Sequence, residues 1–165
     1  AWIIPPMPIV LYRVDERLIH GQVVVGWGGH LRPGRYVVVD TVLAESEWEQ
    51  DLYRLGVPDD IQLMFVTPEA ARRELESWEE SKVRTVLLAR DIGGMLALAR
   101  GGRLQGQEVN LGGLHAREGK EEVLSFLFLD EEDRRMLRRL SSEGVLVSAR
   151  DLPGSSKTTL EDLLR

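Results

Sequence analysis

The sequence predicts an α/β fold: one domain built on an open, mainly parallel twisted sheet with helices on both faces. Near-continuous apolar runs recur at residues 9–14, 36–40, 61–66 and 84–90, and strands of this kind suit a sheet that is covered on both sides. Segments with helical spacing lie between these runs, and such alternation is typical of parallel strands joined by crossovers. The 165 residues are enough for one core and too few for two comfortable ones.

The strands follow from β-branched and apolar residues. The longer ones are IVLYRV (9–14), YVVVD (36–40), IQLMFV (61–66) and RTVLLAR (84–90), and shorter candidates are EVNLGG (108–113), VLSFLFL (123–129) and GVLVSAR (144–150).

Two helices carry clear start or stop signals. In TPEAARRELESW (67–78), Thr67 is a cap and Pro68 occupies the first turn. LDEEDRRMLRRLSSEG (129–144) begins with acids and ends at Gly144.

Composition narrows the function classes. Residues 1–6 (AWIIPP) join no periodic pattern, and we expect an expression remnant or disordered start there, with a single domain over residues 7–165. No apolar run is long enough for a membrane span, so we expect a cytoplasmic protein. The net charge of −6 argues against nucleic acid as a partner, and the absence of cysteine excludes thiol chemistry.

Three glycine-containing segments fail as phosphate loops. GWGGHL (26–31) has leucine where a dinucleotide fingerprint needs glycine, and GLHAREGKE (113–121) has the wrong glycine spacing for a Walker loop. GSSKTT (154–159) has serine before its lysine and is better interpreted as a polar loop or helix cap. We therefore expect no nucleotide cofactor.

The histidines are His20, His30 and His115, and none is spaced with another as paired metal ligands are, so we expect no metal site. His30 lies in a glycine-rich turn and is expected to be solvated. His115 is followed by Arg117 and Lys120, and its role stays open.

The segment RVDERLIHGQV (13–23) places His20 where a strand passes into a helix. An imidazole is largely uncharged at neutral pH and can accept a phosphoryl group without a strong base. Arg13 and Arg17 could donate to phosphoryl oxygens, and backbone N–H groups at Gly21 and Gln22 could do the same at a helix N-terminus. Asp15 or Glu16 could fix one ring nitrogen; the alternative is that these acids only pair with the arginines.

RVDERLIHGQVVVGW (13–27) closely resembles the signature of the IIB component of the mannose/fructose/sorbose family of the bacterial sugar phosphotransferase system. That signature reads R-I-D-D-R-L-I-H-G-Q-V, followed shortly by tryptophan. VNLGGLHAREGK (109–120) is similar to a second segment of the family, N-V-G-G-M-x-x-R-x-G-K. With the late helix and strand, the resemblance covers nearly everything from Met7 onward.

The resemblance implies a protein-histidine/sugar phosphotransferase without cofactor. His20 would carry the phosphoryl group on Nδ1, with Arg13, Asp15 and Arg17 in the surrounding loop. The IIA component would be the donor, and the sugar held by membrane IIC and IID components the acceptor. The protein would be cytoplasmic or peripheral to the membrane through that permease, and homodimers occur among similar proteins.

Some residues depart from the family pattern. Glu16 replaces a second aspartate, Val25 replaces a frequent threonine, and RDIGG (90–94) replaces a polar, proline-containing loop, so the role of Arg90 and the sugar class stay open. One alternative is a regulatory module that is phosphorylated on the same histidine without coupling to transport. A nucleotide-binding α/β domain is the weaker alternative.

Overall fold

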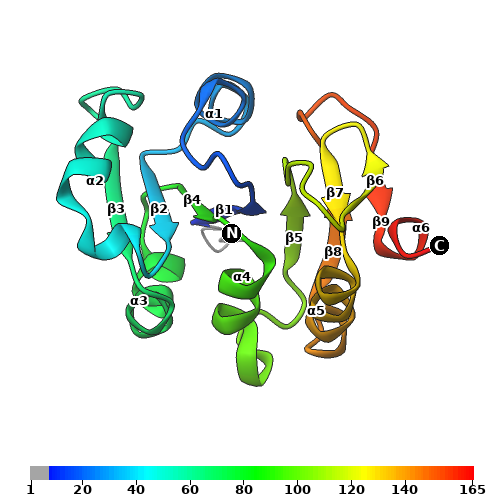
Figure 1. The fold of residues 1–165 in the computed structure, drawn as a ribbon. Helices are drawn as coiled ribbons and strands as arrows, with labels where there is room; N and C mark the ends of the chain where they lie inside the picture. The colour runs from blue at the N-terminus through cyan, green and yellow to red at the C-terminus, as the bar shows by residue number, and fades with distance from the viewer. Residues whose placement is uncertain (1–7) are drawn as a thin grey trace.

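The computed structural model describes residues 8–165, and a single sheet organises them (Figure 1). Its strands are β1 (Ile9–Val14), β2 (Arg35–Val39), β3 (Gln62–Val66), β4 (Thr85–Ala89), β5 (Glu108–Leu111), β8 (Leu146–Ala149) and β9 (Thr158–Thr159). Their order across the sheet is β3-β2-β4-β1-β5-β8-β9. All neighbours are parallel except β9, which runs antiparallel to β8 at one edge. The predicted fold class is confirmed.

Helices cover both faces of this sheet (Figure 1). On one face lie η1 (Gln22–Trp27), α1 (Gly28–Leu31), η2 (Leu43–Glu45) and α2 (Glu47–Arg54), over a core that includes Val23, Tyr36 and Leu88. On the other lie α3 (Pro68–Glu80), α4 (Ile92–Ala99) and α5 (Glu131–Ser142), whose core includes Leu75 and Met95. The short η3 (Arg100–Gly102) follows α4, and α6 (Leu160–Leu163) follows β9.

The predicted helix boundaries depend on identifiable caps. The Thr67 hydroxyl accepts a hydrogen bond from the Ala70 amide at 3.1 Å and starts α3. Asp130 and Asp133 form a capping box at the start of α5. Gly144 has a φ of +86° after that helix, a backbone conformation that favours glycine. The interpretation of GSSKTT (154–159) as a polar loop or helix cap is confirmed for the cap, because Thr159 is the N-cap of α6.

One sequence-based prediction is wrong. Residues 123–129 are not one strand but parts of a hairpin, in which β6 (Glu121–Leu124) pairs antiparallel with β7 (Leu127–Leu129) outside the main sheet. The turn was hard to recognise because it lies within an apolar run. Its two residues are Ser125 and Phe126, and only the serine is of a type that is common in turns.

The expectation for residues 1–6 falls outside the described residues. Within residues 8–165, no helix combines the length and the apolar character that crossing a membrane requires.

The connections diverge at the carboxyl end of β1. The chain leaves β1 toward the face that carries η1 and α1, whereas it leaves the adjacent β4 toward the face that carries α4. In open α/β sheets, ligands bind where the connections of neighbouring strands diverge in this way. The predicted histidine loop starts at this point.

Candidate functional site

The loop that follows β1 stays attached to both neighbouring strands. The Asp15 amide donates to the Ala89 carbonyl at 3.0 Å, and the Glu16 amide donates to the Gly113 carbonyl at 2.9 Å. The chain then turns, with the Leu18 amide on the Asp15 carbonyl at 3.0 Å. Leu18 has a φ of +58°, although its side chain is completely buried. This turn brings the next residues back over the strand ends.

As a result, the His20 ring lies against the carboxylate of Asp15. The distance from Nε2 to Oδ2 is 3.2 Å, and the histidine side chain is 16% exposed. Nδ1 has no hydrogen-bond partner among the described residues, and it is not sealed from solvent. A carboxylate favours the tautomer that carries its proton on Nε2, so the lone pair resides on Nδ1. In that tautomer the free lone pair of the ring lies on the open nitrogen.

Arg13 lies beneath this pair and is completely buried. Its guanidinium donates to Asp15 Oδ2 at 3.0 Å, to Asn110 Oδ1, to the Arg150 carbonyl at 2.9 Å and to the Asp151 carbonyl at 3.2 Å. Nε also donates to Asp15, so all three nitrogens have partners within the described chain. The expectation that Arg13 donates to a phosphoryl oxygen is therefore wrong. Its physical role is to hold Asp15.

The charges of this cluster keep Asp15 ionised. Burial by itself would raise the pKa of Asp15, but the hydrogen bond with His20 and the positive charge of Arg13 outweigh it, and the pKa lies well below its usual range. Burial lowers the pKa of Arg13, and the charge of Asp15 opposes that change. A guanidinium nevertheless stays protonated in proteins. The His20 ring therefore lies against a carboxylate that is ionised near neutral pH.

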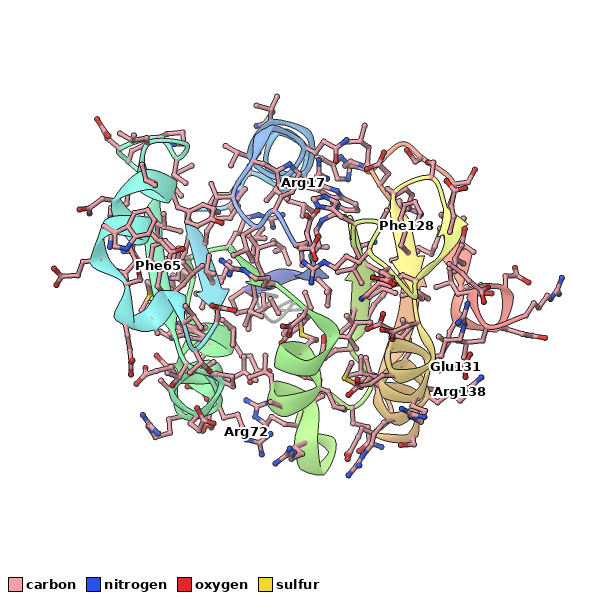
Figure 2. The ribbon with its side chains drawn as sticks, viewed as in Figure 1. Arg17, Phe65, Arg72, Phe128, Glu131 and Arg138 are labelled. Atoms are coloured by element: carbon pink, nitrogen blue, oxygen red, sulfur yellow. The ribbon has the colours of Figure 1, made fainter. Side chains whose placement is uncertain are left out.

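Arg17 has the accessible guanidinium of the loop, with a side chain that is 36% exposed. Its amide and Nε approach Asp15 Oδ1 at 3.0 and 3.4 Å, and Nη2 donates to Gln22 Oε1 at 2.7 Å. Figure 2 labels Arg17 on the segment between β1 and α1, far from Glu131 on α5. Gly113 leaves room for this arginine, since a Cβ there would lie 3.2 Å from Nη2. The predicted Arg17 and Gln22 are thus brought together.

The start of η1 adds backbone donors. Gly21 is its N-cap and is exposed, and no atom lies within 4 Å of the position of an added Cβ. The amides of Gly21 and Gln22 donate to no acceptor among the described residues. First-turn amides of a helix have no acceptor inside the helix and can bind an anion.

A hollow of about 200 Å³ opens beside the loop, and we call it the site hollow. It is lined by Arg17, Gln22, Gly113, His115, Phe126 and Asp151. The sequence interpretation missed Phe126 and Asp151. Asp151 follows β8, and its place just beyond a strand's carboxyl end is the signal that could have identified it.

The described residues match a known protein family. The model of the family described as "PTS system sorbose subfamily IIB component" matches residues 9–165. The chain belongs to this IIB family. Its members are phosphotransferase-system proteins, so this IIB chain has a role in sugar phosphotransfer.

Individual relatives cover nearly the whole IIB chain. The N-acetylgalactosamine-specific enzyme IIB component 1 of Escherichia coli is 31% identical, over 93% of this chain and 97% of that protein. Its crystal structure has a TM-score of 0.84, covering 92% of this chain and 98% of that one. The sorbose permease IIB domain of Klebsiella pneumoniae has a TM-score of 0.84 at 25% identity, covering 95% and 96% of the two chains.

In this IIB chain, Glu16 does not contact His20. Its Oε2 accepts hydrogen bonds from the His115 amide at 3.1 Å and lies 2.8 Å from His115 Nδ1, while Oε1 pairs with Arg117 at 2.5 Å. Of the two acids left open by the sequence, Asp15 holds the ring and also pairs with both arginines. Glu16 fastens the loop to residues 115–117.

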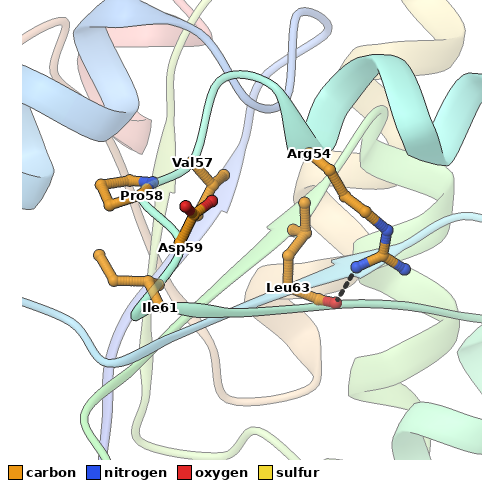
Figure 3. Close-up of a pocket in the computed structure, with 6 residues that line it drawn as sticks. All are labelled: Arg54, Val57, Pro58, Asp59, Ile61 and Leu63. Carbon is orange, nitrogen blue, oxygen red and sulfur yellow. Dashed lines mark hydrogen bonds between the residues drawn. The ribbon is translucent and has the colours of Figure 1, made fainter.

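Two further hollows of the IIB chain have different linings. One of about 130 Å³ adjoins Arg90 and Arg117 and includes the Lys120–Asp133 ion pair at 2.9 Å. Another, of about 150 Å³, lies between α2 and β3, where Arg54 donates to the Leu63 carbonyl at 3.3 Å (Figure 3). His20 is absent from the linings of both, as it is from the lining of the site hollow.

Proposed function

We propose that this chain is a phosphohistidine carrier, in which His20 accepts a phosphoryl group from a IIA component and passes it to a sugar during uptake through membrane IIC and IID components. The observation that carries the proposal is the contact of Asp15 with Nε2, which leaves Nδ1 free to attack. Membership of the IIB family supports the same role.

In the proposed first step, the Nδ1 lone pair attacks the phosphorus of a phosphohistidine on the donor protein. The new nitrogen–phosphorus bond forms as the donor's bond breaks, and that electron pair returns to the donor ring. Asp15 keeps the Nε2 proton in place and stabilises the positive charge that the ring gains. Because both partners are imidazoles, the exchange is nearly balanced, and positioning matters more than driving force.

The phosphoryl oxygens need donors that are already in position. Arg17 would supply a guanidinium, and Gly21 and Gln22 would supply backbone amides at the start of η1. Fixed donors of this kind stabilise the charge on the oxygens of a loose phosphoryl-transfer transition state. Arg13 would act only through Asp15.

Partners and place in the cell belong to the same proposal. The relatives include proteins named as specific for N-acetylgalactosamine, fructose, mannose and sorbose, so we infer a hexose or related sugar as the acceptor. A soluble IIA donor and a membrane permease place the chain in the cytoplasm, at times docked on the membrane. Residues 7–165 would form a single IIB-type phosphocarrier domain.

The test is phosphorylation by the general enzymes of the system and IIA, followed by mass mapping. Wild-type chain should carry the label on His20, and His20→Ala should carry none, because no other ring combines an open nitrogen with a buried carboxylate within the described residues. His30→Ala is the matched control, since His30 is exposed on α1. Label that persists in His20→Ala, with the fold intact, would remove the proposal.

A further inference from the structure

We propose that the exposed apolar face of α2 is the surface on which this chain docks to the cytoplasmic loops of the membrane IIC and IID components. The face consists of Trp48, Leu52 and Leu55, and we call it the α2 stripe. The inference rests on the proposed carrier function, because docking there would serve the transfer of the phosphoryl group to the sugar that the membrane components hold.

The α2 stripe consists of large apolar side chains that face solvent. Trp48 is 68% exposed, Leu52 58% and Leu55 85%. Their spacing of i, i+4 and i+7 places them on one side of a helix, and Leu55 directly follows α2. Within α2 itself (Glu47–Arg54), no residue is buried. Apolar patches that stay exposed on a folded chain and have polar residues around them mark interaction sites.

The opposite side of α2 attaches the helix to the domain. Gln50 donates to the Leu43 carbonyl at 2.6 Å, and the Tyr53 and Phe65 rings pack with 6.2 Å between their centroids. The guanidinium carbon of Arg54 lies 5.6 Å from the centroid of the same phenylalanine ring. These contacts hold α2 beside β3, the edge strand of the sheet (Figure 1). The α2 stripe takes part in none of them, so substitutions in the stripe should leave the helix in place.

A hollow of about 340 Å³ connects the α2 stripe with the loop of His20. Ile19 lines this hollow together with two residues of the stripe, and it directly precedes His20 in the chain. Gly56 also lines it and lies against the isoleucine, since a Cβ at the glycine would be 3.4 Å from Ile19 Cγ2. The hollow gives a partner a place for an apolar side chain of its own. A protein that covers the α2 stripe therefore reaches the chain neighbour of the histidine.

Acidic residues surround the α2 stripe. At 3.6 residues per turn, Glu47 and Asp51 lie on one flank of the stripe and Glu49 lies on the other. Among the described residues these carboxylates form no ion pair. The two glutamates also suit the positive end of the helix, whereas Asp51 lies beyond the first turn. Arg54 is the only cation in the sequence from 45 to 60. The rim therefore favours a partner with positive charges around an apolar centre.

The negative rim selects one kind of partner. In a symmetric dimer the same surface meets itself, so the acids of two copies would repel one another. The cytoplasmic leaflet of a membrane is negatively charged and would repel the rim as well. Cytoplasmic loops of membrane proteins carry an excess of lysine and arginine, so the loops of IIC and IID have the complementary charge. No such rule fixes the sign of the charge on a soluble IIA donor.

The two transfers of the carrier provide the test, because only the second needs IIC and IID. Wild-type chain, Trp48→Gln and Leu52→Gln are first labelled by phosphorylated IIA, and the labelled chains are added at increasing concentration to membranes that contain IIC and IID. The sugar is whichever of N-acetylgalactosamine, mannose, fructose or sorbose accepts the label from wild type. We expect labelling rates within about twofold of wild type, whereas the chain concentration at half-maximal sugar phosphorylation rises roughly tenfold or more.

A charge variant and a control complete the design. Asp51→Lys should raise the same chain concentration, and its difference from wild type should shrink in high salt, because salt screens charges at the surface. Leu146→Gln is the matched control, at a leucine that is 62% exposed at the start of β8, and it should change neither transfer.

Sugar phosphorylation by Trp48→Gln and Leu52→Gln with the concentration dependence of wild type would overturn the proposal. Equal slowing of both transfers would also overturn it, by assigning the α2 stripe to IIA. Binding of wild-type chain to vesicles of phosphatidylglycerol that lack IIC and IID would assign the stripe to lipid instead, and a wild-type dimer that the variants convert to monomers would assign it to a second copy. A wild-type chain that takes no label on His20 would refute the carrier function itself.

Discussion

The carboxylate of Asp15 is completely buried and interacts with Arg13, Arg17 and the ring of His20. Removing one member of a buried ion pair leaves the other charge uncompensated. This lowers the stability of the fold far more than replacing both members by apolar residues does. Arg13 would be the stranded charge here. The same carboxylate therefore contributes to folding and to the chemistry of the loop.

Replacing Asp15 by asparagine should lower the free energy of unfolding by about 3–5 kcal/mol near neutral pH. The pKa of Asp15 is depressed in the folded state, so its stabilisation is present above the unfolded value of about 4 and is lost as the pH falls toward the folded value. Urea unfolding of both proteins at about pH 7, 5 and 3 measures this.

The difference in free energy of unfolding between wild type and Asp15→Asn should thus be largest at the two higher pH values and smaller at the lowest. The exposed Asp60→Asn serves as the control and should follow wild type throughout. A difference in free energy of unfolding that grows as the pH falls would contradict a lowered pKa of Asp15 in the folded state.

At this scale the sequence predicted much of the site. The strand-to-helix position of His20, with Asp15, Arg17 and Gln22 nearby, could be recognised because all lie within one short segment. The role of Arg13 could not, because its depth is set by Asn110 and Arg150, which are far along the chain. The sequence alone does not show whether an arginine side chain faces solvent or the core.

Among the elements, β5 is followed directly by a residue that lies against this cluster. Gly112 donates its amide to the Val14 carbonyl at 2.7 Å, and a Cβ there would lie 2.2 Å from Arg13 Nη2 and 2.6 Å from Asp15 Oδ2. The guanidinium and the carboxylate are both fully buried and cannot swing away. Glycine follows this strand because any side chain at that position would displace the pair.

Gly112→Ala should therefore cost about 1–3 kcal/mol of stability, as overpacking does, and should slow labelling of His20 because Asp15 is displaced. Urea unfolding and the initial rate of labelling by phosphorylated IIA are the measurements. Gly29→Ala is the control, since no atom within 4 Å meets a Cβ at that helical glycine. A Gly112→Ala chain with wild-type stability and rate would contradict the packing argument.

Local sequence patterns explain some of the helices and strands but not all of them. The long strands and the capped helices α3 and α5 follow from apolar runs and terminal residues that act locally. The helix expected after His20 is η1, but local propensity does not explain it, since Val23, Val24 and Val25 are β-branched and favour strands. Burial of Val23 and Trp27 against the sheet determines its conformation instead.

For the whole molecule, the topology gathers the site from distant segments. The carboxyl ends of β1, β5 and β8 supply Asp15, Gly113 and Asp151, and the β6–β7 turn supplies Phe126. These strands are neighbours only because the sheet order differs from the chain order. The fold class was predictable from periodicity, but this juxtaposition was not, and that is why the site hollow was missed.

The left-handed turn at Leu18 has a consequence for how the molecule responds to chaotropes. That conformation costs a leucine roughly 1–2 kcal/mol. Burial of the side chain stabilises the turn by ~1.5–3 kcal/mol. The two terms nearly cancel at this turn, so the turn depends on burial of the Leu18 side chain, while the sheet is held by many ladder hydrogen bonds. Urea weakens apolar burial, so labelling of His20 should fail at concentrations that leave the far-ultraviolet circular dichroism untouched. Superimposable loss curves would mean that the loop and the sheet melt as one unit.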